Sequence, residues 1–217
     1  MKVLITAGPT REPLDPVRFI SNRSTGKMGF ALAQAAAEAG HEVTLVAGPV
    51  ALPTPPGVRR RDVETALEML EAVREALPAC DAFIACAAVA DWRPETCAPT
   101  KLKKAEMDGM LRLVRNPDIL KSVRPLKGTR RFVGFAAETG EPTAEATRKL
   151  REKGLDLIVA NDVTAPGAGF ATETNRVTLL FPDGSRDPLP LMSKHDVARR
   201  IIAWLSRPGH PGERPSN

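Results

Sequence analysis

Charged and amide side chains crowd the stretch between residues 3 and 29, VLITAGPTREPLDPVRFISNRSTGKMG. An apolar run predicts a buried strand at its start, and the polar loop that follows carries Arg18 and Asn22. The loop ends at Ser24-Thr25-Gly26, which can cap the following helix and, with Lys27, face a phosphate. This crossing takes about twenty residues, where ordinary connections take about 2–6. The length and charge favour a binding site, although a plain helix cap beside an exposed lysine also fits the motif.

Polar residues also follow small residues at the ends of predicted strands. They are Asp91 after Ala87-Ala88, Glu138-Thr139 after Gly134-Phe135-Ala136-Ala137, and Asn161-Asp162 after Ala160. Ligands of open parallel sheets bind at these carboxyl ends. Small side chains let a flat ring or an acyl chain lie against the backbone. The Asp91 carboxylate would then accept hydrogen bonds from an exocyclic amine or a ribose hydroxyl; a turn aspartate is the alternative.

Lysines supply the third kind of candidate. The run Lys101-Leu102-Lys103-Lys104 lies in an irregular segment and reads either as a solvated loop or as a loop that brings positive charge to a phosphate. Lys149 and Lys153 share one helical face, from which Arg148 and Arg151 are expected to point away. No histidine is placed like a general base. The residues therefore favour chemistry by positioning and charge stabilisation over a side-chain nucleophile.

Alternating strand and helix patterns position these groups and predict an α/β fold with a parallel sheet between helices. Strands are expected at 2–7, 43–47, 81–88, 132–136 and 155–160. Helices are expected at 26–39, 62–77 with Asp62 as its cap, 142–153, and 194–205 capped by Ser193. Residues 176–181 and 188–191 suggest a β-hairpin. Residues 91–118 read as irregular, with a short hairpin around Asp108-Gly109.

Composition narrows the classes of function. The 217 residues are 42% hydrophobic without an apolar run of about 18, and Met1 leads directly into a strand, so neither a membrane span nor a signal peptide is expected. Cys80, Cys86 and Cys97 show no metal-binding spacing and favour a reducing cytoplasm. The net charge is +5, with two Trp and no Tyr, so base-stacking platforms are scarce. A phosphorylated small molecule explains the basic residues as well as nucleic acid does.

Six motifs, in order, resemble phosphopantothenoylcysteine synthetase, the phosphopantothenate–cysteine ligase of coenzyme A biosynthesis. They are TAGPTREPLDPVRFISNRSTGKMG, CAAVADWRP, KLKK, RNPDIL, GFAAET and ANDV. The resemblance implies a Rossmann-like three-layer α/β/α sandwich over residues 1–205, with a mostly parallel sheet, a C-terminal β-hairpin and a disordered tail at 206–217. It implies that CTP and Mg²⁺ convert 4′-phosphopantothenate to an acyl-cytidylate, which the amine of L-cysteine then attacks. It also implies a homodimer in which a loop of one subunit approaches the partner's site.

The resemblance assigns roles residue by residue. Asn22 would handle the acyl-cytidylate, Arg18 would clamp the substrate, and Lys101 would serve cytidylate formation. The nucleotide would contact Gly8, Ala87, Asp91, Lys101, Asn116, Pro117, Asp118, Ile119, Phe135, Lys149 and Lys153. Arg18, Asn22 and Ala88 would contact the acid substrate. No metal ligands are indicated, and Pro9, which stands where many members have glycine, removes one N–H donor.

Other functions remain in view. An NAD(P)-binding Rossmann reductase is disfavoured by the missing GxGxxG and the absence of Tyr. A non-catalytic nucleotide-binding subunit is disfavoured by the retained Arg18, Asn22, Asp91 and Lys101. Nucleic-acid binding is supported only by the net charge and the arginine-rich tail. In many bacteria the synthetase follows a flavin-dependent decarboxylase in one chain, so this sequence is either a stand-alone enzyme or an excised domain.

Overall fold

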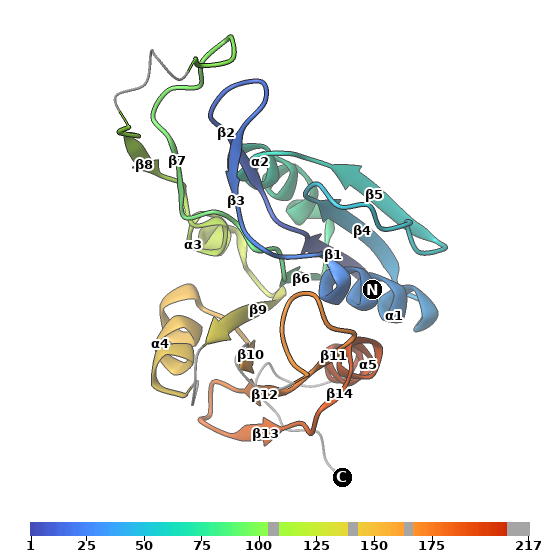
Figure 1. Ribbon diagram of the computed structural model, residues 1–217. Coiled ribbons are helices and arrows are strands. Elements are labelled where there is room, and N and C mark those ends of the chain that lie inside the picture. Colours follow the sequence, from blue (N-terminus) through green and yellow to red (C-terminus); the bar gives the residue numbers. More distant parts are fainter. Residues whose placement is uncertain (104–108, 139–142, 163–166, 208–217) are drawn as a thin grey trace.

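A single sheet of eight strands runs through the molecule (Figure 1), and the computed structural model describes residues 1–103, 109–138, 143–162 and 167–207. The strand order is β13-β12-β10-β9-β6-β1-β4-β5. Six strands are parallel: β1 (Lys2–Ala7), β4 (Glu42–Ala47), β5 (Val58–Asp62), β6 (Ala82–Ala85), β9 (Arg131–Glu138) and β10 (Leu157–Asp162). The antiparallel edge is the predicted hairpin of β12 (Val177–Leu180) and β13 (Arg186–Pro188).

Helices cover both faces of this sheet, which confirms the expected three-layer architecture. Strand β1 shows why, because Val3 and Ile5 join one hydrophobic core while Leu4 joins the other. The first core holds α1 (Lys27–Glu38) and α5 (Lys194–Leu205). The second holds α2 (Ala66–Ala76), α3 (Ile119–Val123) and α4 (Thr143–Lys153). Short 3₁₀ turns, η1 (Leu77–Ala79) and η3 (Arg124–Leu126), follow α2 and α3.

The long first crossing folds into a hairpin of β2 (Arg11–Pro13) and β3 (Phe19–Ser21). Residues 91–118 are less irregular than expected, because β7 (Trp92–Pro94) pairs with β8 (Leu113–Arg115). Residues 92–103 and 109–115, here called the arm, project beside the β2–β3 hairpin (Figure 1). The predicted turn at Asp108-Gly109 lies partly outside the described residues. These two hairpins build an extension above the carboxyl edge of the sheet.

One predicted helix start and one predicted side-chain cap are wrong. Asp62 ends β5, and α2 begins after Thr65, whose hydroxyl accepts a hydrogen bond from the Glu68 amide at 3.2 Å. The Glu68 carboxylate in turn accepts one from the Thr65 amide at 3.3 Å. The Ser24-Thr25-Gly26 run provides no side-chain cap for α1, whose N-cap is Gly26 at φ 78°. Helix α2 therefore starts at the Thr65–Glu68 capping box, three residues after Asp62.

The C-terminal helix follows prediction, since Ser193 caps α5 by accepting a bond from the Asp196 amide at 3.0 Å. Two short strands were not predicted, β11 (Thr174–Asn175) and β14 (Met192–Ser193), which pair just before α5. Of the expected tail, Ser206 and Arg207 end the helix, and 208–217 lie outside the described residues. No helix in the described ranges combines the length and the apolar character needed to cross a membrane.

Candidate active site

A cleft of about 530 Å³ opens at the carboxyl ends of β6 and β9. It collects segments that are distant in sequence: the β6 end, the start of α3, the β9 end, one side of α4, and Phe170. Ten of the residues predicted for the site line it: Ala87, Ala88, Asp91, Asn116, Pro117, Asp118, Ile119, Phe135, Lys149 and Lys153. The sheet topology explains the gathering, because parallel strands deliver their ends to a common edge.

Backbone contacts fix the β6 end of the cleft. The Thr6 hydroxyl accepts from the Ala87 amide at 3.3 Å, and the buried Thr10 hydroxyl accepts from the Ala90 amide at 3.0 Å. The Ala88 amide donates to the Gly8 carbonyl at 2.9 Å. Gly8 therefore supports the wall without lining it. The same wall leaves the Asp91 carboxylate exposed, and Asp91 makes no side-chain hydrogen bond or ion pair with any described residue.

Asn116 ties the α3 side of the cleft to the β6 side. Its amide nitrogen donates to the Ala90 carbonyl at 2.9 Å, and its backbone amide donates to the Asp91 carbonyl at 2.8 Å. Arg93 donates to the Asn116 side-chain oxygen at 3.0 Å and to the Arg115 carbonyl at 2.9 Å. Arg93 was not a predicted site residue, and its position after a turn gave no sign of this contact. The Asn116 amide thus holds the loop that carries Asp91.

Lysines and carboxylates alternate along the α4 side. Lys149 and Lys153 face the cleft as predicted, and Lys153 pairs with Asp118 at 3.0 Å. Asp118 also caps α3 by accepting from the Lys121 amide at 3.0 Å. Arg148 was expected to point away, but it also lines the cleft.

Two carboxylates account for the position of Arg148, because Glu145 and Glu152 each bind its guanidinium at 2.5 Å. These bonds raise the pKa of Arg148 and lower the pKa values of both carboxyls.

Besides Gly8, three predicted residues lie outside the cleft lining. Asn22 comes closest, because its amide nitrogen donates to the Ala88 carbonyl at 2.9 Å. Arg18 binds the buried Asp15 carboxylate at 2.6 Å and the Leu102 carbonyl at 2.9 Å. The Asp15 carboxylate also accepts from the Leu102 amide at 3.2 Å, and its bond from Arg18 holds the Asp15 pKa well below its usual range.

Lys101 is the third of these residues. It lies exposed on the arm, beside Leu102, which the Asp15–Arg18 pair holds in place. Within the chain as described, Lys101 is thus presented to solvent and not to its own cleft.

Sequence reasoning missed the loop 167–175, whose Phe170 lines the cleft. Thr25 donates to the Phe170 carbonyl at 2.7 Å, and Lys27 binds the Ala171 carbonyl at 3.1 Å and the Glu173 carboxylate. Lys194, only 5% exposed, donates to the carbonyls of Gly169, Thr172 and Thr174. In the Ser24–Lys27 motif, which was expected to face a phosphate, the Thr25 and Lys27 side chains therefore anchor this loop instead.

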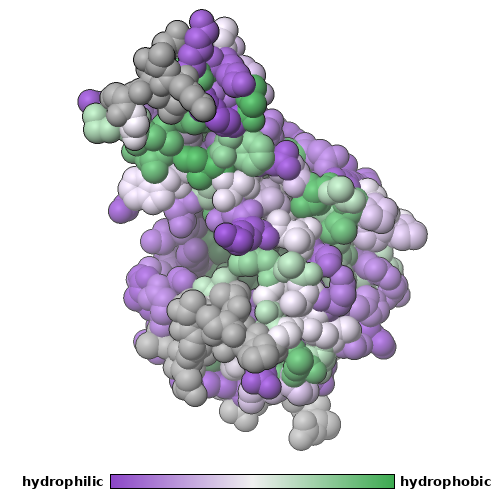
Figure 2. All heavy atoms as spheres, viewed as in Figure 1, coloured by the Kyte–Doolittle hydropathy of each residue, from purple (hydrophilic) through white to green (hydrophobic). Residues whose placement is uncertain are grey.

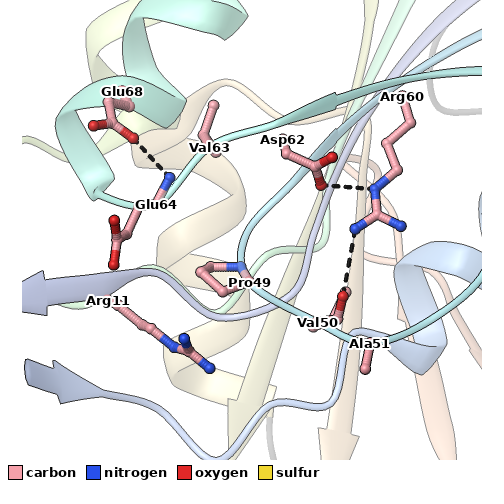
Figure 3. A pocket seen from close by; sticks show the side chains of 9 residues that line it. All are labelled: Arg11, Pro49, Val50, Ala51, Arg60, Asp62, Val63, Glu64 and Glu68. Atoms are coloured by element: carbon pink, nitrogen blue, oxygen red, sulfur yellow. Dashed lines mark hydrogen bonds and ion pairs between the residues drawn. The ribbon is translucent and has the colours of Figure 1, made fainter.

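A second hollow of about 760 Å³ lies at the ends of β4 and β5 (Figure 3). Arg60, Asp62 and Glu68 of its lining already have structural partners. Arg60 binds Asp62 and the Leu52 carbonyl at 2.7 Å each, while Glu68 caps α2. None of the residues predicted for the nucleotide or the substrate lines it. Beside this hollow the chain is tightly packed, since a Cβ on Gly48 would lie 1.8 Å from the Pro9 carbonyl oxygen.

Comparison with known proteins identifies the family of the chain. The family model described as the DNA/pantothenate metabolism flavoprotein C-terminal domain matches residues 1–207. The coenzyme A biosynthesis bifunctional protein CoaBC of Escherichia coli (strain K12) is 54% identical over 206 residues, 93% of this chain and 50% of that protein. The Bacillus subtilis (strain 168) CoaBC is 50% identical over 216 residues, 98% of this chain and 53% of that protein.

A crystal structure of the C-terminal domain of a CoaBC superimposes with a TM-score of 0.81 at 44% identity, covering 94% of this chain and 93% of that one. The chain spans about half the length of these curated relatives. By its sequence and its fold, the chain belongs to the family of DNA/pantothenate metabolism flavoprotein C-terminal domains.

Proposed function

We propose that this chain is a phosphopantothenate–cysteine ligase of coenzyme A biosynthesis that uses CTP. The observation that carries the proposal is the cleft, which brings ten residues predicted for nucleotide and acid binding together from separate segments. The relatives support it, since they are named as coenzyme A biosynthesis proteins. The reducing cytoplasm is the proposed compartment, in keeping with three free cysteines.

The reaction joins two steps at one site. A carboxylate oxygen of 4′-phosphopantothenate attacks the α-phosphate of CTP, and pyrophosphate leaves. The amine of L-cysteine then attacks the acyl carbon, and CMP leaves with the electron pair. Lys149, Lys153 and Arg148 stand where they offset phosphate charge, and Phe135 offers a flat apolar face to the nucleotide.

Mg²⁺ fits as an ion carried in by the triphosphate. Within the described ranges no group of three or more His, Cys, Asp or Glu side chains could hold a metal. Mg²⁺ typically binds one or two carboxylates together with substrate phosphates. Asp118 and Glu152 are already paired with Lys153 and Arg148, so Asp91 is the cleft carboxylate proposed to contact the ion. When bound, the ion would neutralise triphosphate charge.

The arm is the proposed contact between two copies of the chain. Figure 2 shows hydrophobic side chains gathered in this upper part of the molecule. Exposed apolar residues there are Val17 (58%), Phe19 (48%), Trp92 (42%), Met110 (76%), Leu111 (42%) and Leu113 (42%). A contiguous apolar patch of this kind marks an interaction surface. Pairing two arms would also bring the exposed Lys101 of one copy toward the other.

We expect Leu113→Glu to convert the dimer to a monomer, measured by light scattering on the eluting protein. A buried unpaired carboxylate is costly at an apolar interface. Leu67→Glu is the matched control, because Leu67 is a similarly exposed leucine, 46%, on α2. A wild-type monomer, or a Leu113→Glu variant that stays dimeric, would contradict the arm as the interface.

The ligase assignment is tested by pyrophosphate release. With 4′-phosphopantothenate, L-cysteine and Mg²⁺ present, we expect release with CTP that depends on phosphopantothenate. Release with ATP alone would keep the ligase and overturn the nucleotide. No release with either nucleotide from a folded dimer would favour a binding-only subunit or an enzyme that needs the decarboxylase half found in its relatives.

A dinucleotide reductase finds no support in the fold. In such enzymes the backbone around the first glycines approaches a pyrophosphate. Here the β4–β5 loop covers that place, because a methyl carbon of Val50 lies 3.2 Å from where a Gly8 Cβ would be and 3.1 Å from that of Gly26. Nucleic-acid binding, which would show a steep salt dependence, is not expected.

A further inference from the structure

The turn of the β2–β3 hairpin lies beside the arm (Figure 1), and three hydrogen bonds join the two. The Ala98 amide donates to the Leu14 carbonyl at 3.0 Å. The Leu102 amide donates to the Asp15 carboxylate at 3.2 Å, and the Leu102 carbonyl accepts from the Arg18 guanidinium at 2.9 Å. Both backbone groups of one arm residue are therefore held by an ion pair of the hairpin turn.

The Asp15 carboxylate divides its hydrogen bonds between its two oxygens, and its side chain has no solvent exposure. Oδ1 accepts from the backbone amides of Val17 and Arg18 at 2.8 Å each, which closes the hairpin turn. Oδ2 accepts from two nitrogens of the Arg18 guanidinium, at 2.6 and 3.0 Å, and from the Leu102 amide. One oxygen thus shapes the turn, and the other attaches Arg18 and the arm to it.

Lys101 lies directly before the residue that this junction holds. Residues 99–103 belong to no helix or strand, so no regular backbone pairing fixes their course. The peptide group between Lys101 and Leu102 carries the amide that Asp15 binds. The backbone at Lys101 is therefore fixed while its side chain stays exposed, and this contact sets the point from which the lysine ammonium extends.

We infer that Asp15 is a positioning residue for the ligase reaction, because it fixes the Arg18 guanidinium and the backbone of Lys101 relative to each other. The inference rests on the proposed function, in which Arg18 clamps the acid substrate and Lys101 offsets charge as the acyl phosphate forms. Asp15 is buried outside the cleft lining and acts only through these two cations. Such placement matters, since a displacement of about 1 Å can cost about 100-fold in rate.

Asp15→Asn separates the two tasks of the carboxylate. The amide oxygen can replace Oδ1 and keep the turn, whereas the amide nitrogen would face Arg18 and Leu102, which are themselves donors. We expect kcat for phosphopantothenate-dependent pyrophosphate release to fall at least about tenfold. The KM for CTP should stay near the wild-type value, because no residue of this junction lines the cleft.

Two readouts show whether the loss acts through Lys101. First, Asp15→Asn should cost a smaller factor in a Lys101→Gln background than in the wild type, because part of its effect has already been lost with the lysine. Second, trypsin should cut the Lys101–Leu102 bond at least about fivefold faster in Asp15→Asn, because this bond must leave the junction to be cleaved.

Asp187→Asn is the matched control. It also replaces an aspartate that binds an arginine, here Arg200 at 3.2 Å, but on β13 at the far edge of the sheet. This variant should leave both the pyrophosphate rate and the trypsin cleavage rate unchanged. Asp15→Ser guards against a folding defect, because a serine hydroxyl can still close the turn but offers no second oxygen to Arg18 and Leu102. It should show the same loss of kcat as Asp15→Asn.

The outcomes separate this inference from the proposed function. A wild-type kcat in either folded Asp15 variant, an unchanged cleavage rate, or an equal loss with and without Lys101 would overturn the positioning role. A wild-type enzyme that releases no pyrophosphate would refute the ligase proposal, whereas the trypsin result would still test the junction by itself.

Discussion

Replacing Lys101 by glutamine is expected to lower phosphopantothenate-dependent pyrophosphate release by at least about 100-fold, equivalent to about 2.7 kcal/mol of barrier. The ammonium is proposed to offset negative charge as the acyl phosphate forms, and glutamine keeps its length without its charge. The fold should persist, because Lys101 is exposed and makes no hydrogen bond or ion pair among the described residues. Release at the wild-type rate would remove Lys101 from the mechanism. Lys103→Gln, in the same loop, is the control expected to retain most activity.

Subunit mixing would then show whose cleft Lys101 serves. If the arm reaches the partner, a dimer of one Lys101→Gln subunit and one Asp91→Asn subunit contains one site with both native residues. Random mixing of the two inactive proteins should restore about a quarter of wild-type activity in a two-fold dimer. If Lys101 acts in its own cleft, each site of the mixed dimer keeps one defect, and no activity returns.

Asn22→Asp is expected to separate the two steps of the reaction. The Asn22 amide nitrogen donates to the Ala88 carbonyl at 2.9 Å, which sets the side chain against the wall where the acyl group would lie. Aspartate loses that donor and places negative charge beside the anhydride. Activation should continue, while turnover falls about 100-fold or more.

The readout for Asn22→Asp is one pyrophosphate released per site with little product, and acyl-cytidylate recovered from the quenched reaction. A variant that neither accumulates the intermediate nor loses turnover would show that Asn22 is misassigned. Arg23→Gln is the neighbouring control, since Arg23 is exposed and its side chain makes no hydrogen bond or ion pair with the described residues.

The sequence predicted the parts of the fold in which a local signal, such as a helix cap, agrees with the pattern of apolar residues that pack in the core. Helix α5 has a serine cap and one apolar face, so both signals gave the same bounds. Strand β5 was missed because its sequence, VRRRD, carries three arginines; it lies at the sheet edge and needs backbone pairing with β4 more than apolar side chains. The hairpin strands β2 and β3 are three residues each, too short for a period to appear.

The candidate site likewise contains residues that the sequence predicted and residues that it did not. Strand ends rich in small residues predicted the cleft, because parallel strands must deliver them to one edge. Phe170 and Lys194 gave no comparable signal: the Thr25 bond that places Phe170 joins residues 145 apart. The position of Arg148 depends on Glu145 and Glu152, the carboxylates one helical turn away on each side. The i, i+3 and i, i+4 spacing of these pairs was available in the sequence, but the prediction considered only the spacing of the two lysines.

The cations along α4 are already paired with carboxylates, so a nucleotide bound as proposed would have to replace those carboxylates as their partner. Before any phosphate arrives, Arg148 is held by Glu145 and Glu152, and Lys153 by Asp118. A triphosphate must displace or share these carboxylates, so part of its attraction is offset by contacts given up. Binding should therefore be weaker, and less sensitive to ionic strength, than three bare cations would make it. In the proposed reaction, the same carboxylates would pair with the cations again when pyrophosphate and CMP depart, which would favour release of both products.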